Sequence, residues 1–423
     1  MVTLGGDGMV GGAHPTAEAA IAYLHSPQAI RDRTRALVAL AEQDQLQHWH
    51  YHPEAMPATA AYVLDVMRQQ YPDGEIPFHS RWRHFEVAGR SRLDLLEPEL
   101  SGLDSLEQAR LKVDLAITSV LLDAGAGSRW RYVEPGTGLE FARSEGLAIA
   151  SFHSFTSGLF SSQTKHPWQA DAHGLTECTA ALLARAFQVN DDNLLLGLEG
   201  RVSLLQKLGH TLQQQPELFG TALPRPGHLV DYWLTQVMDN RLSATTLLHT
   251  ILQGLGPIWP GRVELAGVNL GDVWPHPQLL DTGPGSNLVP FHKLSQWLTY
   301  SLLEPLQDLG LTITDLDQLT GLAEYRNGGL FIDCGVLSLK EPAAAETAHA
   351  PGSPLIVEWR ALTLCLLDDL AAHTRQILRM DAETLPLAKI LQGGTWTAGR
   401  KIAAEKRPGG APPMHLVSDG TVF

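Results

Sequence analysis

Charged and aromatic residues gather in the stretch IPFHSRWRHFE, although charged residues make up only 18% of the chain. An arginine guanidinium gives two parallel hydrogen bonds to a phosphate or carboxylate, and a tryptophan supplies a flat apolar wall. We therefore predict that this stretch binds substrate through Arg81, Trp82, Arg83, His84 and Glu86, with the two arginines on an anionic part. The structural alternative is a buried Arg–Glu network that pins a loop to the core.

Three carboxylates stand beside small residues or apolar runs. Asp123 precedes the small residues AGAG, Glu145 precedes an apolar run, and Glu324 precedes an Asn-Gly-Gly sequence at 327–329 that predicts a tight turn. A carboxylate near a reacting carbon stabilises positive charge or activates water. We predict Glu324 as the leading catalytic residue, followed by Asp123 and Glu145. The structural alternatives are a turn-capping Asp123 and an ordinary salt bridge from Glu324 to Arg326.

Basic and aromatic neighbours complete the predicted site. Lys293 falls on a polar helical face opposite an apolar stripe, so it projects either into solvent or into a cleft. Tyr325 and Arg326 directly follow Glu324. We predict that Lys293, Tyr325 and Arg326 contact substrate, and that Arg326 lowers the pKa of Glu324. Most of these site residues should line one pocket.

The motifs that hold metals and phosphates in other proteins do not occur in the sequence. The histidines of HWHYHP alternate, but no Asp or Glu of matching spacing accompanies them, so we favour solvated histidines at a helix end. The three cysteines are scattered, and no P-loop, GxSxG, HExxH or paired CxxC motif is present. We expect no metal and no cofactor.

The bulk composition narrows the function classes. The chain has 423 residues and a net charge of −15, which repels a phosphate backbone, so we expect no nucleic-acid partner. No run of eighteen apolar residues predicts a membrane span, and the start MVTLGGDGMVGGAHP lacks signal-peptide features. We expect a cytoplasmic protein that acts on a small nucleoside- or nucleotide-derived molecule. The sequence leaves the oligomeric state open.

Helical periodicity dominates the chain. The stretches with a helical pattern are 106–125, 179–188, 294–310 and 355–378. Strand-like patterns are confined to 130–133 and 330–337. We predict a mainly α fold, with more than half of the residues in helices. Residues 1–15 should be a flexible tail, and residues 16–423 a single mostly helical domain with a small β element.

Two segments near the C-terminus have an unusual composition. PAAAETAHAPGSP, residues 342–354, is typical of a mobile surface loop. The final stretch from GGTWTAGRK onward is too rich in glycine and proline for one long helix, but it carries apolar residues that have reason to be buried. We predict a short helix at 395–405 and an extended end that packs onto the domain.

Six stretches, taken in order, carry a resemblance to a known family. They are IPFHSRWRHFE, LLDAGAGSRWRY, RSEGLAIASF, LTGLAEYRNGGLFID, EWRAL and GGTWTAGRKIAAEKRPGGAPPMHLVSDGTVF. Together they resemble an uncharacterised family linked to the uracil catabolism pathway of fungi and bacteria, over nearly the whole chain. The resemblance implies a pathway that opens the uracil ring at the nucleotide level and then cuts a ribosylurea-type intermediate.

A second likeness, at the level of pattern, is to the queuosine-salvage nucleoside hydrolases, which are helical and related to DNA glycosylases. In that family an Asp with small and aromatic residues ends a helix, as Leu122-Asp123-Ala124 does here. Its Phe-Tyr-Lys helix start is similar to Phe291-His292-Lys293, and its Ala-Asp-Tyr-Arg to Ala323-Glu324-Tyr325-Arg326, with Glu for Asp. The resemblance implies a DNA-glycosylase-like helical fold and hydrolysis of an N-glycosidic bond.

The sequence thus predicts a metal-independent N-glycoside hydrolase that cleaves a ribosylurea-type nucleoside or nucleotide. Such cleavage passes through a cationic sugar that a carboxylate stabilises, while a second group hydrogen-bonds the leaving urea. Two other functions stay open. One is a non-catalytic binding or scaffold protein of the same pathway. The other is a phosphoribosyltransferase, although the sequence lacks an acidic pair in an apolar strand followed by a Thr/Gly phosphate loop.

Overall fold

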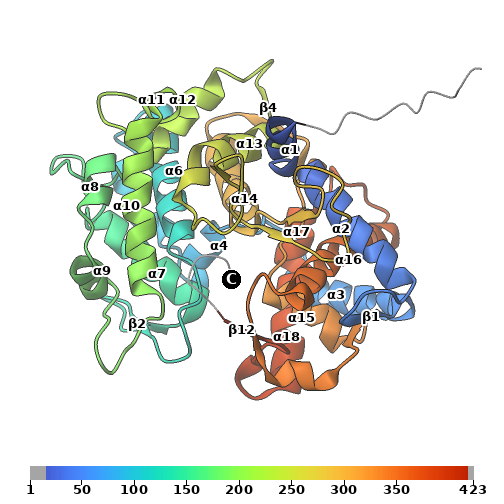
Figure 1. The fold of residues 1–423 in the computed structure, drawn as a ribbon. Coiled ribbons are helices and arrows are strands. Elements are labelled where there is room, and N and C mark those ends of the chain that lie inside the picture. Colours follow the sequence, from blue (N-terminus) through green and yellow to red (C-terminus); the bar gives the residue numbers. More distant parts are fainter. Residues whose placement is uncertain (1–15, 418–423) are drawn as a thin grey trace, which may run out of the picture.

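Helices hold more than half of the residues in the computed structural model, which describes residues 16–417 (Figure 1). In the first part of the chain they are α1 (Ala17–Leu24), α2 (Pro27–Glu42), α3 (Met56–Gln70), α4 (Trp82–Phe85), α5 (Glu97–Leu100), α6 (Ser105–Leu121), α7 (Arg143–Thr156), α8 (Ala172–Thr176) and α9 (Ala180–Ala186). They continue as α10 (Leu198–Gln214), α11 (Pro216–Phe219), α12 (Leu229–Leu234), α13 (Ala244–Leu255), α14 (Lys293–Asp308), α15 (Tyr325–Asp333), α16 (Pro354–Leu378), α17 (Leu387–Ile390) and α18 (Trp396–Lys406). The predicted mainly α fold is therefore confirmed.

The strands of the described chain are short and associate only in pairs. The antiparallel pairs are β1 (Trp49–Tyr51) with β10 (Leu337–Leu339), β2 (Tyr132–Val133) with β3 (Glu140–Phe141), β5 (Glu264–Leu265) with β6 (Val268–Asn269), and β7 (Val273–Pro275) with β8 (Leu288–Pro290). The parallel pairs are β4 (Arg241–Ser243) with β9 (Thr312–Thr314) and β11 (Ala348–His349) with β12 (His415–Leu416). The pairs β1–β10, β4–β9 and β11–β12 join distant parts of the chain, and no pair extends into a larger sheet within the described residues.

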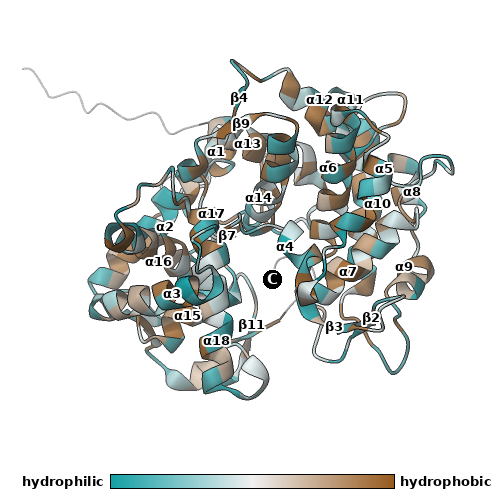
Figure 2. Cartoon of the chain, turned by 180° about the vertical axis from the view of Figure 1, so that it is seen from behind, coloured by the Kyte–Doolittle hydropathy of each residue, from teal (hydrophilic) through white to brown (hydrophobic). Residues whose placement is uncertain are grey.

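Two groups of helices face each other across the molecule in Figure 1. The first lobe consists of α6 to α12, and the second lobe of α2, α3 and α15 to α18. In Figure 2 hydrophobic and hydrophilic residues alternate along outer helices such as α10 and α16, so each helix has an apolar side to bury. One continuous hydrophobic core, from Ile30 to Met414 in the sequence, includes residues of both lobes.

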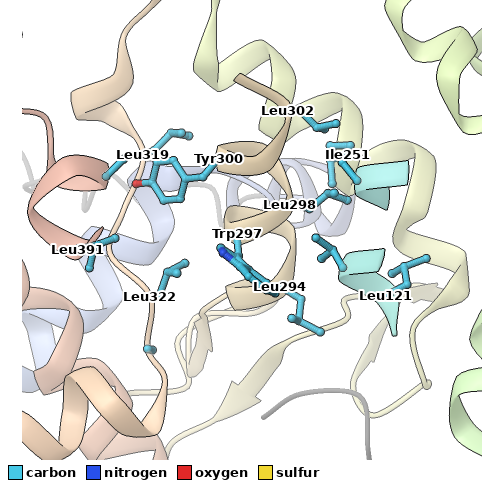
Figure 3. Close-up of a cluster of buried hydrophobic side chains, with 14 of the residues drawn as sticks. Leu121, Ile251, Leu294, Trp297, Leu298, Tyr300, Leu302, Leu319, Leu322 and Leu391 are labelled. Atoms are coloured by element: carbon cyan, nitrogen blue, oxygen red, sulfur yellow. The ribbon is translucent and has the colours of Figure 1, made fainter. Parts of the chain in front are cut away.

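Helix α14 connects the two lobes. Figure 3 shows its buried side chains, with Leu121 of α6 and Ile251 of α13 on one side and Leu319, Leu322 and Leu391 on the other. Its first backbone amide, that of Lys293, donates to the Asp272 carboxylate at 3.1 Å, which caps the helix from a distant loop. The start of α14 is therefore fixed at the boundary between the lobes.

Four of the predicted helices occur close to where the pattern places them, as α6, α9, α14 and α16. The prediction of a turn at 327–329 and a strand at 330–337 was wrong, because these residues form α15 and only β10 follows as strand. The glycines serve packing: a Cβ on Gly328 would lie 2.7 Å from the Trp359 ring of α16. Glycine permits this close contact between helices because it has no Cβ. The same glycines make the local sequence look like a turn, which is why the helix was missed.

Three further expectations need correction or stay open. Residues 342–354, predicted as a mobile surface loop, lie at the surface but contain a 3₁₀ turn at Pro342–Glu346, the strand β11 and the start of α16. The histidines of HWHYHP lie on and beside the strand β1, not at a helix end. The short C-terminal helix is confirmed as α18, and β12 packs the following chain onto the second lobe. The predicted tail at 1–15 and the last six residues lie outside the described chain.

None of the helices within residues 16–417 combines the length and the hydrophobicity that crossing a bilayer requires.

Candidate functional site

A pocket of about 410 Å³ lies between the two lobes. The first lobe contributes the turn at 123–128, which follows α6, and the start of α7. Lys293 and Trp297 of α14 come from the middle of the molecule, and the second lobe contributes residues 324–326 and α18. The chain end from Pro412 to Leu416 also lines the pocket.

The structure brings seven of the eleven predicted site residues together in this pocket. They are His84, Asp123, Glu145, Lys293, Glu324, Tyr325 and Arg326. The remaining four, Arg81, Trp82, Arg83 and Glu86, are not among its lining residues. The stretch that looked most like a substrate-binding loop therefore contributes one side chain directly, that of His84.

Arg81 lies behind the pocket wall and is fully buried. Its Nη1 is 2.9 Å from Oδ2 of Asp123, and its Nε donates to the Ser119 hydroxyl at 2.7 Å. Oδ1 of Asp123 accepts no hydrogen bond from any described residue, so this oxygen is available on the pocket side. Arg81 thus orients the Asp123 carboxylate and does not reach the pocket itself.

The other three residues of the stretch hold the wall together. The Trp82 indole donates to the Ser301 carbonyl at 2.7 Å, which ties α4 to α14. Arg83 forms ion pairs with Glu304 at 2.6 Å and with Glu86 at 3.0 Å, and both Arg83 and Glu86 line a separate surface hollow. The structural alternative of an Arg–Glu network describes these residues well.

Glu324 is the N-cap of α15 and is almost buried. Its Oε1 accepts from the Asn327 amide at 2.6 Å and its Oε2 from the Arg326 amide at 2.7 Å, so the carboxylate is held in one orientation. Burial raises the pKa of Glu324 above its usual range, although the two backbone hydrogen bonds and the charges of Lys293 and Arg326 lower it. Arg326 thus lowers the pKa of Glu324 as predicted, but the effect of burial is larger and the net shift is upward.

Lys293 presents its ammonium group to the pocket without a hydrogen bond or ion pair to any described residue. Burial lowers the pKa of Lys293 below its usual range, while the charges of Glu324 and Asp123 raise it. Its backbone is fixed through Asp272, whose two oxygens each accept from the Arg360 guanidinium at 2.7 Å. The Asp272–Arg360 pair therefore sets the position of the lysine from outside the pocket.

Glu145 and His84 line another part of the wall. Nη1 of Arg400 is 2.5 Å from Oε1 of Glu145. Burial raises the pKa of Glu145, but the charges of Arg400 and His84 together with its hydrogen bonds outweigh burial, so the pKa lies below its usual range. Burial lowers the pKa of His84 to about 4, and its Nδ1 has no hydrogen-bond partner in the described chain. His84 is therefore a neutral imidazole at pH 7.

Several pocket residues were not singled out from the sequence. They are His79, Arg143, Ser144, Trp297, Trp396, Arg400 and the segment Pro412–Leu416. The His84 ring lies edge-on to Trp297 and Trp396, with 5.8 Å between ring centres in both cases, so two tryptophans form an apolar wall. Trp396 and Arg400 belong to the GGTWTAGRK stretch that carries the family resemblance, and this was their only signal in the sequence. The resemblance did not indicate that they line a pocket.

Backbone turns at the pocket are held by buried polar side chains. Arg201 of α10 donates from Nε to the Leu122 carbonyl at 3.0 Å and from Nη2 to the Ala124 carbonyl, which fixes the turn that carries Asp123. On the other side, a π-helical turn at Leu391–Thr395 leads into α18, and Oε1 of its Gln392 accepts from Nδ1 of His79 at 2.9 Å. In residues 16–417 no three His, Cys, Asp or Glu side chains converge as metal ligands do.

The comparison with known proteins agrees with the sequence resemblance. The model of the family described as "Protein of unknown function (DUF1688)" matches residues 23–423. The chain belongs to this family. It is 40% identical over 413 residues to "Protein urg3" of Schizosaccharomyces pombe, covering 95% of this chain and 99% of that protein. It is 38% identical over 446 residues to "Uracil catabolism protein 4" of Lachancea kluyveri, covering 96% of this chain and 100% of that protein.

Members of the DUF1688 family can thus be compared with this chain along its whole length. The match includes every lining residue of the pocket, from His79 to Leu416, because it spans residues 23–423. The arrangement joins three carboxylates, two tryptophans and a lysine whose ammonium has no partner in the described part of the chain in one cavity. Chemically, such a cavity can bind a small polar ring and transfer protons at it.

Proposed function

We propose that this chain hydrolyses the N-glycosidic bond of a ribosylurea-type nucleoside or nucleotide in uracil catabolism. The printed name of the Lachancea kluyveri relative, identical at 38% of positions over nearly the whole chain, supports the pathway. The observation that carries the reaction is the Lys293 ammonium, which has no hydrogen-bond or ion-pair partner among residues 16–417 and feels the charges of both Glu324 and Asp123. A lysine near two carboxylates can serve as a general acid that gives its proton to the leaving nitrogen.

The first requirement of the reaction is a cavity of suitable size and polarity. At about 410 Å³ the pocket suits a small sugar derivative. Trp297 and Trp396 offer flat apolar surfaces for the sugar or for the planar urea, and the carboxylates offer acceptors for sugar hydroxyl groups. The hydrophobic walls also exclude water, which strengthens the electrostatic interactions inside.

In the bond-breaking step the C–N bond cleaves and its electron pair moves to the urea nitrogen. Lys293 gives that nitrogen a proton, and positive charge develops on the sugar ring. The Glu324 carboxylate, held by two backbone amides, stabilises this charge without reorientation. A water molecule then attacks the sugar carbon and passes a proton to Oδ1 of Asp123. Transfer of that proton back to Lys293 restores the enzyme and leaves urea and the free sugar.

The experiment is a product assay with two compounds, N-ribosylurea and its 5′-phosphate. The purified chain should release urea together with ribose or ribose 5-phosphate. Lys293→Met should lower turnover on the order of 10²-fold or more, as loss of a general acid does. The control is Lys207→Met, because Lys207 is an exposed lysine of α10 far from the lining residues.

Other outcomes would identify the alternatives. If both compounds bind and stay intact over many hours, the chain is a binding or scaffold protein. If the sugar phosphate is instead exchanged between a base and pyrophosphate, it is a phosphoribosyltransferase. Equal turnover in Lys293→Met and wild type would remove the lysine from the mechanism.

A further inference from the structure

Two arginines of the pocket hold the same short segment of backbone. Nη2 of Arg143, at the start of α7, donates to the Gly409 carbonyl at 3.2 Å. Nη1 of Arg326, in the first turn of α15, donates to the Gly410 carbonyl at 3.0 Å. Both side chains line the pocket, one from each lobe, and the adjacent carbonyls bring their positive charges together.

Within residues 16–417 neither arginine forms an ion pair with a carboxylate. Arg326 differs in this from three other buried arginines, which pair with acids: Arg81 with Asp123, Arg92 with Glu134 and Arg225 with Asp114. Arg326 is only 6% exposed, and burial of a charge without a counter-charge is costly.

A second buried arginine without an acidic partner shows what a purely structural role looks like. Arg201 donates from Nε, Nη1 and Nη2 to backbone carbonyls, so all parts of its guanidinium are engaged. Arg326 and Arg143 each make one hydrogen bond to the described protein, out of five donors available to each guanidinium. Most of their donors therefore remain for a ligand.

We propose that Arg143 and Arg326 form the subsite for a phosphate monoester on the sugar of the substrate. A phosphate monoester carries between one and two negative charges at pH 7 and three acceptor oxygens, which two guanidinium groups match. The proposal rests on the proposed function for the identity of the sugar. It also moves anion binding away from Arg81 and Arg83, whose guanidinium groups are already paired with Asp123 and Glu304.

The surroundings of the two arginines agree with a phosphate at this position. The Arg326 guanidinium carbon lies 4.9 Å from the centre of the Tyr325 ring. Burial raises the pKa of the Tyr325 hydroxyl, and the charges of Arg326 and Arg143 both lower it. Arg326 lies in the first turn of α15, two residues after Glu324, which caps that helix. A sugar phosphate bound here would place its ring next to the carboxylates, with its phosphate toward Gly409 and Gly410.

The experiment measures binding of ribose 5-phosphate and of ribose by calorimetry, so it does not depend on turnover. Wild type should bind the phosphorylated sugar at least tenfold more tightly. Arg143→Gln and Arg326→Gln should each reduce that preference by about tenfold, because each removes charge-assisted hydrogen bonds to the phosphate. Affinity for unphosphorylated ribose should stay nearly the same.

Arg407→Gln is the matched control. Arg407 holds the same backbone segment, with its Nε on the Ala411 carbonyl at 2.7 Å, and pairs with Asp333, but it does not line the pocket. Its loss should leave the preference for phosphate intact. Equal loss of preference in Arg407→Gln and Arg326→Gln would overturn the proposal and give both arginines a structural role. Wild type with no preference would overturn it as well.

The results separate this subsite from the proposed reaction. Hydrolysis of N-ribosylurea with no preference for its 5′-phosphate would leave the function standing and remove the subsite. Phosphate-dependent binding that requires Arg143 and Arg326, without hydrolysis of either compound, would keep the subsite and remove the hydrolase activity.

Discussion

Glu324 caps α15, and in the proposed mechanism it has a chemical role as well. Both of its oxygens accept backbone amides at the start of α15, and it faces the pocket next to Lys293. Asp123 has fewer interactions, because among the described residues only its Oδ2 has a partner, the Arg81 guanidinium. At the scale of the residue we therefore assign charge stabilisation to Glu324 and water activation to Asp123, and each role can be tested by a change that keeps shape.

Glu324→Gln should lower turnover on N-ribosylurea by about 10²–10⁴-fold, because it removes the charge that stabilises the cationic sugar. It should also weaken the helix cap, at a cost of about 1 kcal/mol in the free energy of unfolding. Asp171→Asn is the matched control, since Asp171 is the buried N-cap of α8. Its two carboxylate oxygens accept hydrogen bonds from the backbone amides of Gly174 and Ser162. It should lose comparable stability and keep turnover per folded molecule; the same outcome for Glu324→Gln would make that residue purely structural.

The free energy of unfolding should fall as the pH decreases from 6.5 to 4, in part because of His84. Burial lowers its pKa from 6.5 to about 4 in the folded chain, so in this range the unfolded state binds the proton first. The contribution is on the order of 1–3 kcal/mol. Urea unfolding curves at pH 7, 5.5 and 4 should show a shallower decline for His84→Gln than for wild type. Parallel declines would contradict the assignment of a neutral buried imidazole.

At the scale of the element, the site depends on how closely α15, α16 and α18 approach one another. Gly328 faces the Trp359 ring of α16, and Gly399 of α18 faces the backbone of α15. These glycines let three helices pack almost backbone to backbone, which fixes Glu324, Arg326 and Trp396 relative to one another. A side chain at either position would change the shape of the pocket as well as the core.

Gly399→Ala should lower the free energy of unfolding by about 1–3 kcal/mol, because the new Cβ would lie 2.3 Å from the Arg326 carbonyl oxygen. That oxygen belongs to the backbone of α15, so it can move only if the helix moves. The displacement of α15 should also reduce turnover. Gly102→Ala is the control, since a Cβ there would meet only the Glu99 carbonyl oxygen, at the ordinary van der Waals distance of 3.7 Å. Thermal unfolding of both variants tests this, and equal melting temperatures would show that the two helices adjust freely.

At the scale of the whole molecule, the pocket exists only where both lobes and the chain end meet. β12 pairs with β11, Met414 is buried, and Gly409 and Gly410 receive arginines from both lobes. The segment from Gly409 to Leu416 therefore connects the lobes across the pocket, in addition to α14.

A chain that ends at Pro408 should melt at a lower temperature and lose binding of ribose 5-phosphate, because it lacks β12 and four pocket residues of the 412–416 segment. Circular dichroism should still show a mainly helical protein, since α1 to α18 end before that point. Unchanged melting and unchanged binding in the truncated chain would show that the segment is dispensable.

The sequence by itself determined the helical character, four helix positions within a few residues, and several polar residues that stand out beside apolar runs. These follow from local pattern, because amphipathic periodicity and polar residues inside apolar runs are visible along one chain. The sequence also located α18, whose pattern stands between glycine-rich stretches. It did not reveal that Asn327, Gly328 and Gly329 lie inside a helix, since their local preference is for a turn and the packing against Trp359 overrides it.

Only the tertiary structure decided which charged residues face the pocket and which are already paired. Arg81 and Arg326 have the same chemistry and lie beside similar neighbours in the sequence, yet one is engaged by Asp123 and the other has no acid partner among the described residues. The hydrogen-bond partners of these guanidinium groups come from distant segments: Ser119 lies 38 residues from Arg81, and Gly410 lies 84 residues from Arg326. No local pattern encodes such pairing, because it depends on the packing of helices from both lobes.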